Sequence, residues 1–269
     1  MRLIGLAALL WLALASPAMA QMPRSDNVID LLEGYGEETS GLANLSTAHV
    51  RVTGTRLETR ADGILAAFRQ VLVRVTGNVS LPDDPRVAML DPLVPSLVED
   101  LAYQDMLSNE PKHDEQGTRD RPFDLRVTFS PGRIVFLLGL LGEKPLRFRP
   151  PIAIQLTIED HGITYPLTAD GDPDERQREA LLAAADRFGL RVRLQPLSGE
   201  KFTLGDPRTA TLSGKVSWSD TTAGWIGHFQ LTLGGKTTEW SITEGVSFDE
   251  AYRNAMGTTL AIMAGKYRK

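Results

Sequence analysis

Residues 50–77, VRVTGTRLETRADGILAAFRQVLVRVTG, begin and end with the same pentapeptide, VRVTG. In the first copy, Val50 and Val52 alternate with polar residues, which is the pattern of a half-buried β-strand. Between the copies, apolar residues recur at the spacing of one helix face: Ile64, Leu65, Phe68, Val71 and Leu72. The second copy alternates again and stops at Gly77-Asn78, a turn signal. A phosphate-binding loop would require a Gly-rich turn with Lys, so the stretch predicts a helix between two similar strands.

The N-terminal residues 1–20, MRLIGLAALLWLALASPAMA, have the features of a cleaved secretory signal peptide. Arg2 is followed by an apolar run over residues 3–15 and by the small-residue cleavage site Ala-Met-Ala. A membrane anchor is the alternative, but an anchor needs roughly 20 apolar residues, and this run is shorter. Residues 21–46 are polar and rich in Gly, Glu and Ser, which predicts a flexible lead-in.

Composition limits the class of protein. The chain has 42% hydrophobic and 23% charged residues, as expected for a globular protein, and its net charge of −5 is unlike the basic field of a nucleic-acid binder. It has 0 cysteines, so it forms no disulfides and carries no cysteine after the signal for lipid attachment. No later segment is long and apolar enough to cross a membrane. We therefore expect a periplasmic protein that is not a lipoprotein.

The pattern divides the mature chain into two domains, at residues 47–142 and 152–269, joined by a linker at 143–151. In the first domain, we expect a helix over 91–103, a loop over 104–121, a strand over 123–129 and a strand or short helix over 133–141. In the second, we expect a hairpin turning at 160–162, a helix ending at Gly189, a three-strand meander over 209–243 and a closing helix from Ser247. The predicted fold is α+β, with two small antiparallel or mixed sheets covered by helices.

The chain has few residues in patterns that carry chemistry, and we predict no metal and no cofactor. Four histidines are scattered along the chain: His49, His113, His161 and His228. Residues 198–201 match the S-x-x-K signature of serine β-lactamases, but they follow a strand and contain Gly199, whereas that nucleophile must begin a helix. We interpret the match as chance. We expect no enzymatic activity, although catalytic residues can be dispersed in a sequence.

Three tryptophans, Trp218, Trp225 and Trp240, lie one on each strand of the predicted meander. Tryptophans on a sheet either pack in the core or form a contact surface for a partner. Trp218 and Trp240 are the candidates for a contact surface. Arg147 and Arg149, in the basic linker, are the other candidate binding residues.

Residues 61–78, ADGILAAFRQVLVRVTGN, resemble the helix–strand block of the bacterial domain-of-unknown-function family 2066. The resemblance continues through Tyr103, FDLRVTF, Arg149-Pro150 and AADRFGLRVRLQPL, and covers residues 46–269. Where the family often has Trp before Arg-Pro, this chain has Phe148. The resemblance implies an exported protein of unknown function and supplies no catalytic residues.

These observations favour a non-catalytic periplasmic envelope protein that binds another protein or an envelope polymer. Two alternatives stay open. A hydrolase of the cell wall or of a small molecule would place a deep polar pocket near Arg147 and Arg149. A solute-binding protein would hold its ligand between the two domains and bend at residues 142–151. The sequence leaves the partner's identity and the oligomeric state open.

Overall fold

The computed structural model of the chain describes residues 42–108, 121–171, 175–196 and 209–268. The predicted signal peptide, residues 21–41 of the predicted lead-in, His113 and the S-x-x-K residues lie outside these ranges. Residues 42–45, which also belong to the predicted lead-in, form a helical turn, and Leu42 and Leu45 pack against a hydrophobic core. None of the helices in the described ranges is long and apolar enough to cross a membrane.

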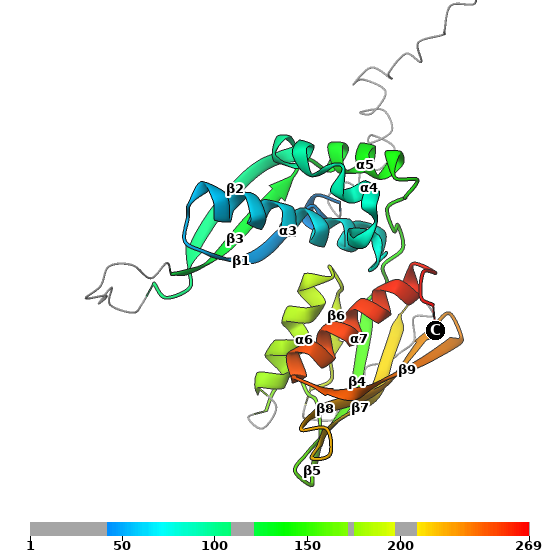
Figure 1. Ribbon diagram of the computed structural model, residues 1–269. Helices are drawn as coiled ribbons and strands as arrows, with labels where there is room; N and C mark the ends of the chain where they lie inside the picture. The colour runs from blue at the N-terminus through cyan, green and yellow to red at the C-terminus, as the bar shows by residue number, and fades with distance from the viewer. Residues whose placement is uncertain (1–41, 109–120, 172–174, 197–208, 269) are drawn as a thin grey trace, which may run out of the picture.

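The N-terminal half, residues 42–142, is built on a three-stranded antiparallel sheet in the order β1-β3-β2. The 20-residue helix α3 packs against this sheet (Figure 1). Its elements are β1 (Thr47–Thr53), α3 (Leu57–Thr76), η1 (Leu81–Asp83), α4 (Pro85–Ala88), η2 (Asp91–Leu97), β2 (Val98–Asp105), β3 (Pro122–Phe129) and α5 (Pro131–Leu140). A buried cluster that includes Phe68, Leu125 and Phe129 fills the space between helices and sheet.

The two VRVTG copies adopt different structures, so the prediction of a second strand at residues 71–76 is wrong. The first copy is strand β1, whereas the second is the last turn of α3, which ends at Gly77 in the left-handed conformation with φ 70°. Residues 71–76 are all buried, because Val71, Leu72 and Val75 face the N-terminal core while Val73 joins the C-terminal core. A helix buried on several sides loses the one-sided periodicity that marks an amphipathic helix.

The predicted helix over residues 91–103 is also wrong. Residues 91–97 form the 3₁₀ helix η2, and the chain then becomes extended as β2. Proline at positions 92 and 95 removes main-chain N–H donors, which favours a short 3₁₀ segment over a continuous α-helix. At residues 133–141, where the sequence left a strand and a short helix open, the structure has helix α5.

The C-terminal half, residues 152–268, contains a six-stranded mixed sheet with helices α6 and α7 on one face (Figure 1). The path of the sheet is β5-β4-β7-β8-β9, with β6 also paired to β4. Its elements are β4 (Ile152–Asp160), β5 (Ile163–Pro166), α6 (Glu175–Arg187), β6 (Val192–Leu194), β7 (Ala210–Ser219), β8 (Gly224–Leu233), β9 (Lys236–Val246) and α7 (Phe248–Met263). The predicted hairpin, meander and two helices are confirmed.

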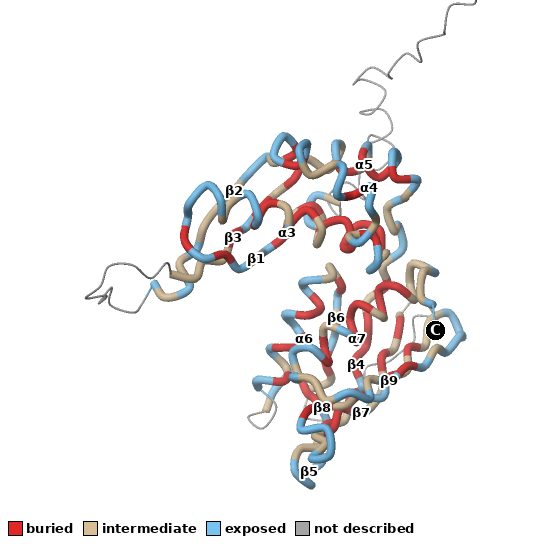
Figure 2. Tube along the Cα trace, in the orientation of Figure 1, coloured by how far each residue is buried: buried red, intermediate tan, exposed pale blue. Residues whose placement is uncertain are grey.

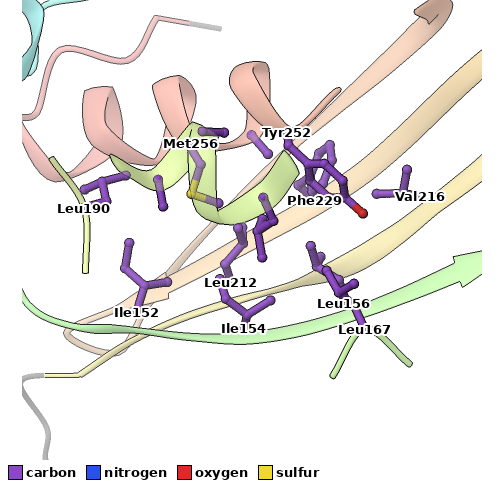
Figure 3. Packing of buried hydrophobic residues seen from close by; sticks show 14 of the residues in the cluster. Ile152, Ile154, Leu156, Leu167, Leu190, Leu212, Val216, Phe229, Tyr252 and Met256 are labelled. Carbon is purple, nitrogen blue, oxygen red and sulfur yellow. The ribbon is translucent and has the colours of Figure 1, made fainter. Parts of the chain in front are cut away.

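The core of the C-terminal half lies between the sheet and the two helices. Figure 3 shows Tyr252 and Met256 of α7 pointing toward strand residues such as Leu212. The Tyr252 hydroxyl donates a buried hydrogen bond to Gln177 Oε1 on α6, at 2.6 Å, which ties the helices together. Buried positions line α3 and α7 (Figure 2). The α+β class is thus confirmed, while the predicted domain boundaries stay predictions.

Candidate functional site

Two hairpin ends meet at the end of the C-terminal sheet that points away from the N-terminal half (Figure 1). Strands β4 and β7 are parallel neighbours, and Glu159 pairs with Ser217 close to where both strands end. The turn after β4 contains His161, and the turn after β7 begins just beyond Trp218. Because parallel strands end at the same edge, the pairing places the two side chains together.

The rings of His161 and Trp218 stack with their centroids 5.3 Å apart and their planes inclined by 20°. Trp218 also meets Trp225 edge-on, with ring centroids 5.9 Å apart, and Trp225 in turn meets Phe248 at 6.3 Å. Trp225 is buried, whereas Trp218 is half-buried and His161 is exposed. The row of rings therefore runs from the core to the surface, and it anchors Trp218 while leaving that side chain partly exposed.

Two carboxylates hold the stacked rings from the same two turns. Asp160 Oδ1 lies 2.6 Å from His161 Nδ1, and the Trp218 indole N–H donates to Asp220 Oδ1 at 2.8 Å. The side chain of His161 is 67% exposed and that of Asp160 is 41% exposed. We call Asp160, His161, Ile163, Trp218 and Asp220 the aromatic tip. It presents rings and negative charge on one surface.

The turns that frame the aromatic tip are strained. His161 has φ 47° and Ala223, in the turn after β7, has φ 48°, and they are the only non-glycine residues with positive φ in the described ranges. A residue with a Cβ pays about 1–2 kcal/mol for the left-handed conformation. Such strain clusters at functional sites, where the surrounding structure holds it in place.

The structure corrects the prediction that Trp240 lies on a contact surface. Trp240 is only 9% exposed and stacks on Phe229, its partner on β8, with ring centroids 5.6 Å apart. It is part of the C-terminal core. The signal was present in the sequence, because Trp240 alternates with the polar Glu239 and Ser241 and therefore shares the inward face of β9.

Arg149 lies between the two halves and hydrogen-bonds main-chain carbonyls. Its guanidinium donates to the carbonyl oxygens of Arg74 and Val75 in the last turn of α3 and to that of Phe188, just after α6. Burial and the neighbouring charge of Arg74 lower the pKa of Arg149 to about 10, so it remains charged at neutral pH. Arg147, in contrast, is exposed. The sequence-predicted arginines therefore lie apart from the tryptophans, and Arg149 is engaged in joining the two halves.

Arg74, beside Arg149, was missed by the sequence analysis. It is 6% exposed, and its guanidinium donates to the carbonyl oxygen of Asn44 at 3.3 Å. Burial lowers the pKa of Arg74, and the charge of Asp186 on α6 opposes that effect. Because Arg74 belongs to the second VRVTG copy, interpreting that copy as a half-exposed strand hid its buried position. The described ranges contain no group of three or more residues placed to hold a metal ion.

Residues 41–143 match a family model described as Domain of unknown function (DUF8605). The match covers less than half of the chain and includes the block at residues 61–78, so the resemblance to family 2066 is wrong. Among solved structures, the chain is similar to one titled "Crystal structure of uncharacterized protein", with 13% identity and a TM-score of 0.24. That alignment covers 44% of this chain and 91% of the other. No curated protein matches the chain.

Proposed function

We propose that this protein is a non-catalytic periplasmic binding module whose aromatic tip contacts a basic segment of an envelope protein. The observation that carries the proposal is the stack of Trp218 on His161, part exposed and flanked by two carboxylates. The compartment follows from the signal peptide expected at the N-terminus.

The aromatic part of the tip supports a protein contact. Tryptophan is enriched among the few interface residues that carry most of the binding energy. Trp218 is held by Trp225 below and His161 beside it, so it loses little side-chain freedom when a partner binds. Ile163, 67% exposed at the start of β5, pairs with Asp160 across the hairpin and adds apolar surface to the tip.

The charge of the tip favours a partner segment that carries Arg or Lys. Asp160 and Asp220 each hold a ring through one carboxylate oxygen, and a carboxylate has a second oxygen that can accept a hydrogen bond. A guanidinium can stack on an exposed aromatic ring and also bind a carboxylate. The chain's net charge of −5 adds a long-range attraction for a basic surface.

Arg149 bears on the hydrolase alternative. That alternative placed a substrate pocket near Arg147 and Arg149, but the Arg149 guanidinium binds main-chain carbonyls of both halves. Its role is therefore that of a connection between the halves. This observation supports binding over hydrolysis as the proposed activity.

Photo-cross-linking in the native bacterium tests the proposal. A benzophenone amino acid replaces Ile163 in the tip or, as a matched control, Phe136 of α5, which is 47% exposed in the other half. We expect one envelope protein to be captured from position 163 and not from 136, through a peptide that contains Arg or Lys. Adding Trp218→Ala should abolish the capture while the circular dichroism spectrum is unchanged. Equal capture at the two positions, or capture that survives Trp218→Ala, would overturn the proposal.

A further inference from the structure

We infer that the groove between the two halves binds a small zwitterion of amino-acid or dipeptide size. The groove has a volume of about 290 Å³ and is lined by residues of β1, α3, α6 and α7. This volume lies just below the range of typical pockets for drug-sized ligands, about 300–1,000 Å³, and therefore limits the ligand to a small molecule. The site is separate from the aromatic tip and lies where the solute-binding alternative placed its ligand.

The floor of the groove is a run of alanines on α6, Ala180, Ala183 and Ala184. Their single methyl groups leave room between α6 and the N-terminal half that larger side chains would fill. Gln70 of α3 faces α6 here, and its Nε2 donates to the carbonyl oxygen of Arg187 at 3.5 Å. The floor therefore suits a ligand with small apolar side chains.

The rim carries both signs of charge, and this argues for a zwitterion. The positive groups are Arg187 and Arg253, and the negative groups are Asp186 and Asp249. A purely anionic ligand would meet the repulsion of the aspartates, and a purely cationic one that of the arginines. His49, which also lines the rim, is paired with Asp124 at 2.7 Å. A ligand that has both a carboxylate and an ammonium group can pair with the arginines and the aspartates of the rim at the same time.

Arg187 and Asp249 are the groups best placed to act on a ligand. Arg253 is paired with Glu250, whereas Arg187 and Asp249 have no ion pair within the part of the chain that the structure describes. Partial burial and the nearby charge of Arg253 lower the pKa of Arg187, against the opposing charge of Glu250. A ligand carboxylate beside Arg187 would relieve this repulsion between like charges.

Isothermal titration calorimetry on the full-length mature protein tests the inference with three matched ligands. The probes are alanyl-alanine, its N-acetylated form without the ammonium, and its C-terminal amide without the carboxylate. We expect alanyl-alanine to bind and each capped form to bind at least about 10-fold more weakly, because each leaves one set of rim charges unpaired. No heat with alanyl-alanine at 10-fold excess over about 1 mM protein, or equal binding of all three, would overturn the inference.

Substitutions at the rim test which residue binds the carboxylate of the ligand and which binds its ammonium group. Arg187→Met should lower the affinity for alanyl-alanine to that of the wild type for the C-terminal amide. Asp249→Asn should lower it to that of the wild type for the N-acetylated form. Arg176→Met is the matched control, because Arg176 is exposed on the same helix and does not line the groove. An equal loss in Arg176→Met would show that binding lies elsewhere. Binding unchanged in both rim variants would also contradict the assignment.

Discussion

The indole of Trp218 lies nearly parallel to the imidazole of His161, with ring centroids 5.3 Å apart, although the two residues belong to different hairpins. The parallel pairing of β4 with β7 creates this relationship by bringing both strand ends to one edge of the sheet. Trp225 and Phe248 continue the row of rings into the core. The exposed stack is thus rigidly supported, which is what a binding anchor requires.

Trp218 and Trp240 should respond differently to truncation. We expect Trp240→Ala to lower the free energy of unfolding by about 3–5 kcal/mol, because it empties a buried site beside Phe229. Trp218→Ala should cost at most about 2 kcal/mol, mainly the lost ring contacts. Denaturant titration followed by circular dichroism measures both. Equal losses would contradict the assignment of Trp240 to the core and Trp218 to the surface.

Arg149 should contribute to stability and Arg147 much less. Arg149→Ala removes the guanidinium that donates to the carbonyl oxygens of Arg74 and Phe188, so we expect the free energy of unfolding to fall by about 2–3 kcal/mol. Arg147→Ala, at an exposed position two residues away, should cost less than about 1 kcal/mol. Urea titrations of the two variants under the same conditions give the comparison. A loss from Arg147→Ala as large as that from Arg149→Ala would refute it.

Alanine variants of Gly77 and Gly142 distinguish the cost of backbone strain from the cost of close packing. Both have nearly the same φ, 70° and 73°, so the left-handed conformation of an alanine at either position costs about 1–2 kcal/mol of stability. A Cβ at Gly77 would lie 2.5 Å from the Cβ of Ala264, whereas none of the described atoms lies within 4 Å of one at Gly142. Gly77→Ala should therefore lower the free energy of unfolding by about a further 1–3 kcal/mol. Thermal and urea unfolding of the two variants should differ accordingly, and similar losses would argue against this contact between α3 and the C-terminal residues.

Glu143 should make stability depend on acid pH. Burial alone would raise the pKa of Glu143, but hydrogen bonds from Lys266 and Asn78 and the charges of Lys266 and Arg86 outweigh it and hold the pKa below its ordinary value. A carboxyl group with a lowered folded-state pKa stabilises the fold above its unfolded pKa, about 4.3 for Glu, and this contribution is lost as the pH falls through the folded-state pKa.

The difference in unfolding free energy between the wild type and Glu143→Gln should thus be constant near neutral pH and shrink below about pH 4.3. Urea titrations across the acid range measure this difference. Lys266→Met should reduce the same pH dependence, because Lys266 supplies the strongest opposing interaction. A difference that stays constant down to pH 3 or so would contradict the role of Glu143.

Local patterns predict the C-terminal half well and the N-terminal half in part. The hairpin and the meander alternate with a period of two and turn at Gly and Asp, so their signals are contained in a few residues. The end of α3 has no such signal, because its residues face two cores and every side is buried. Proline at positions 92 and 95 marked the limit of a helix that the periodicity alone extended too far.

The candidate site could be predicted only one residue at a time. The sequence indicates Trp218 as a contact residue and His161 as a turn residue, but their stacking depends on the parallel pairing of β4 with β7 across a long connection. Arg149 stands out as a basic linker residue, yet its contacts with α3 and α6 depend on how the halves meet. Such non-local contacts leave no periodic trace in the chain.

The role of the aromatic tip is best tested by the dissociation constant of the purified partner captured from position 163. Calorimetry would compare the wild type with Trp218→Ala and with Phe136→Ala, the exposed aromatic control in the other half. We expect Trp218→Ala to weaken binding by about 30-fold or more, which corresponds to the loss of a Trp anchor that contributes about 2 kcal/mol. Phe136→Ala should change it by no more than about twofold. A Trp218→Ala protein that binds within about twofold of the wild type would contradict the role of the aromatic tip.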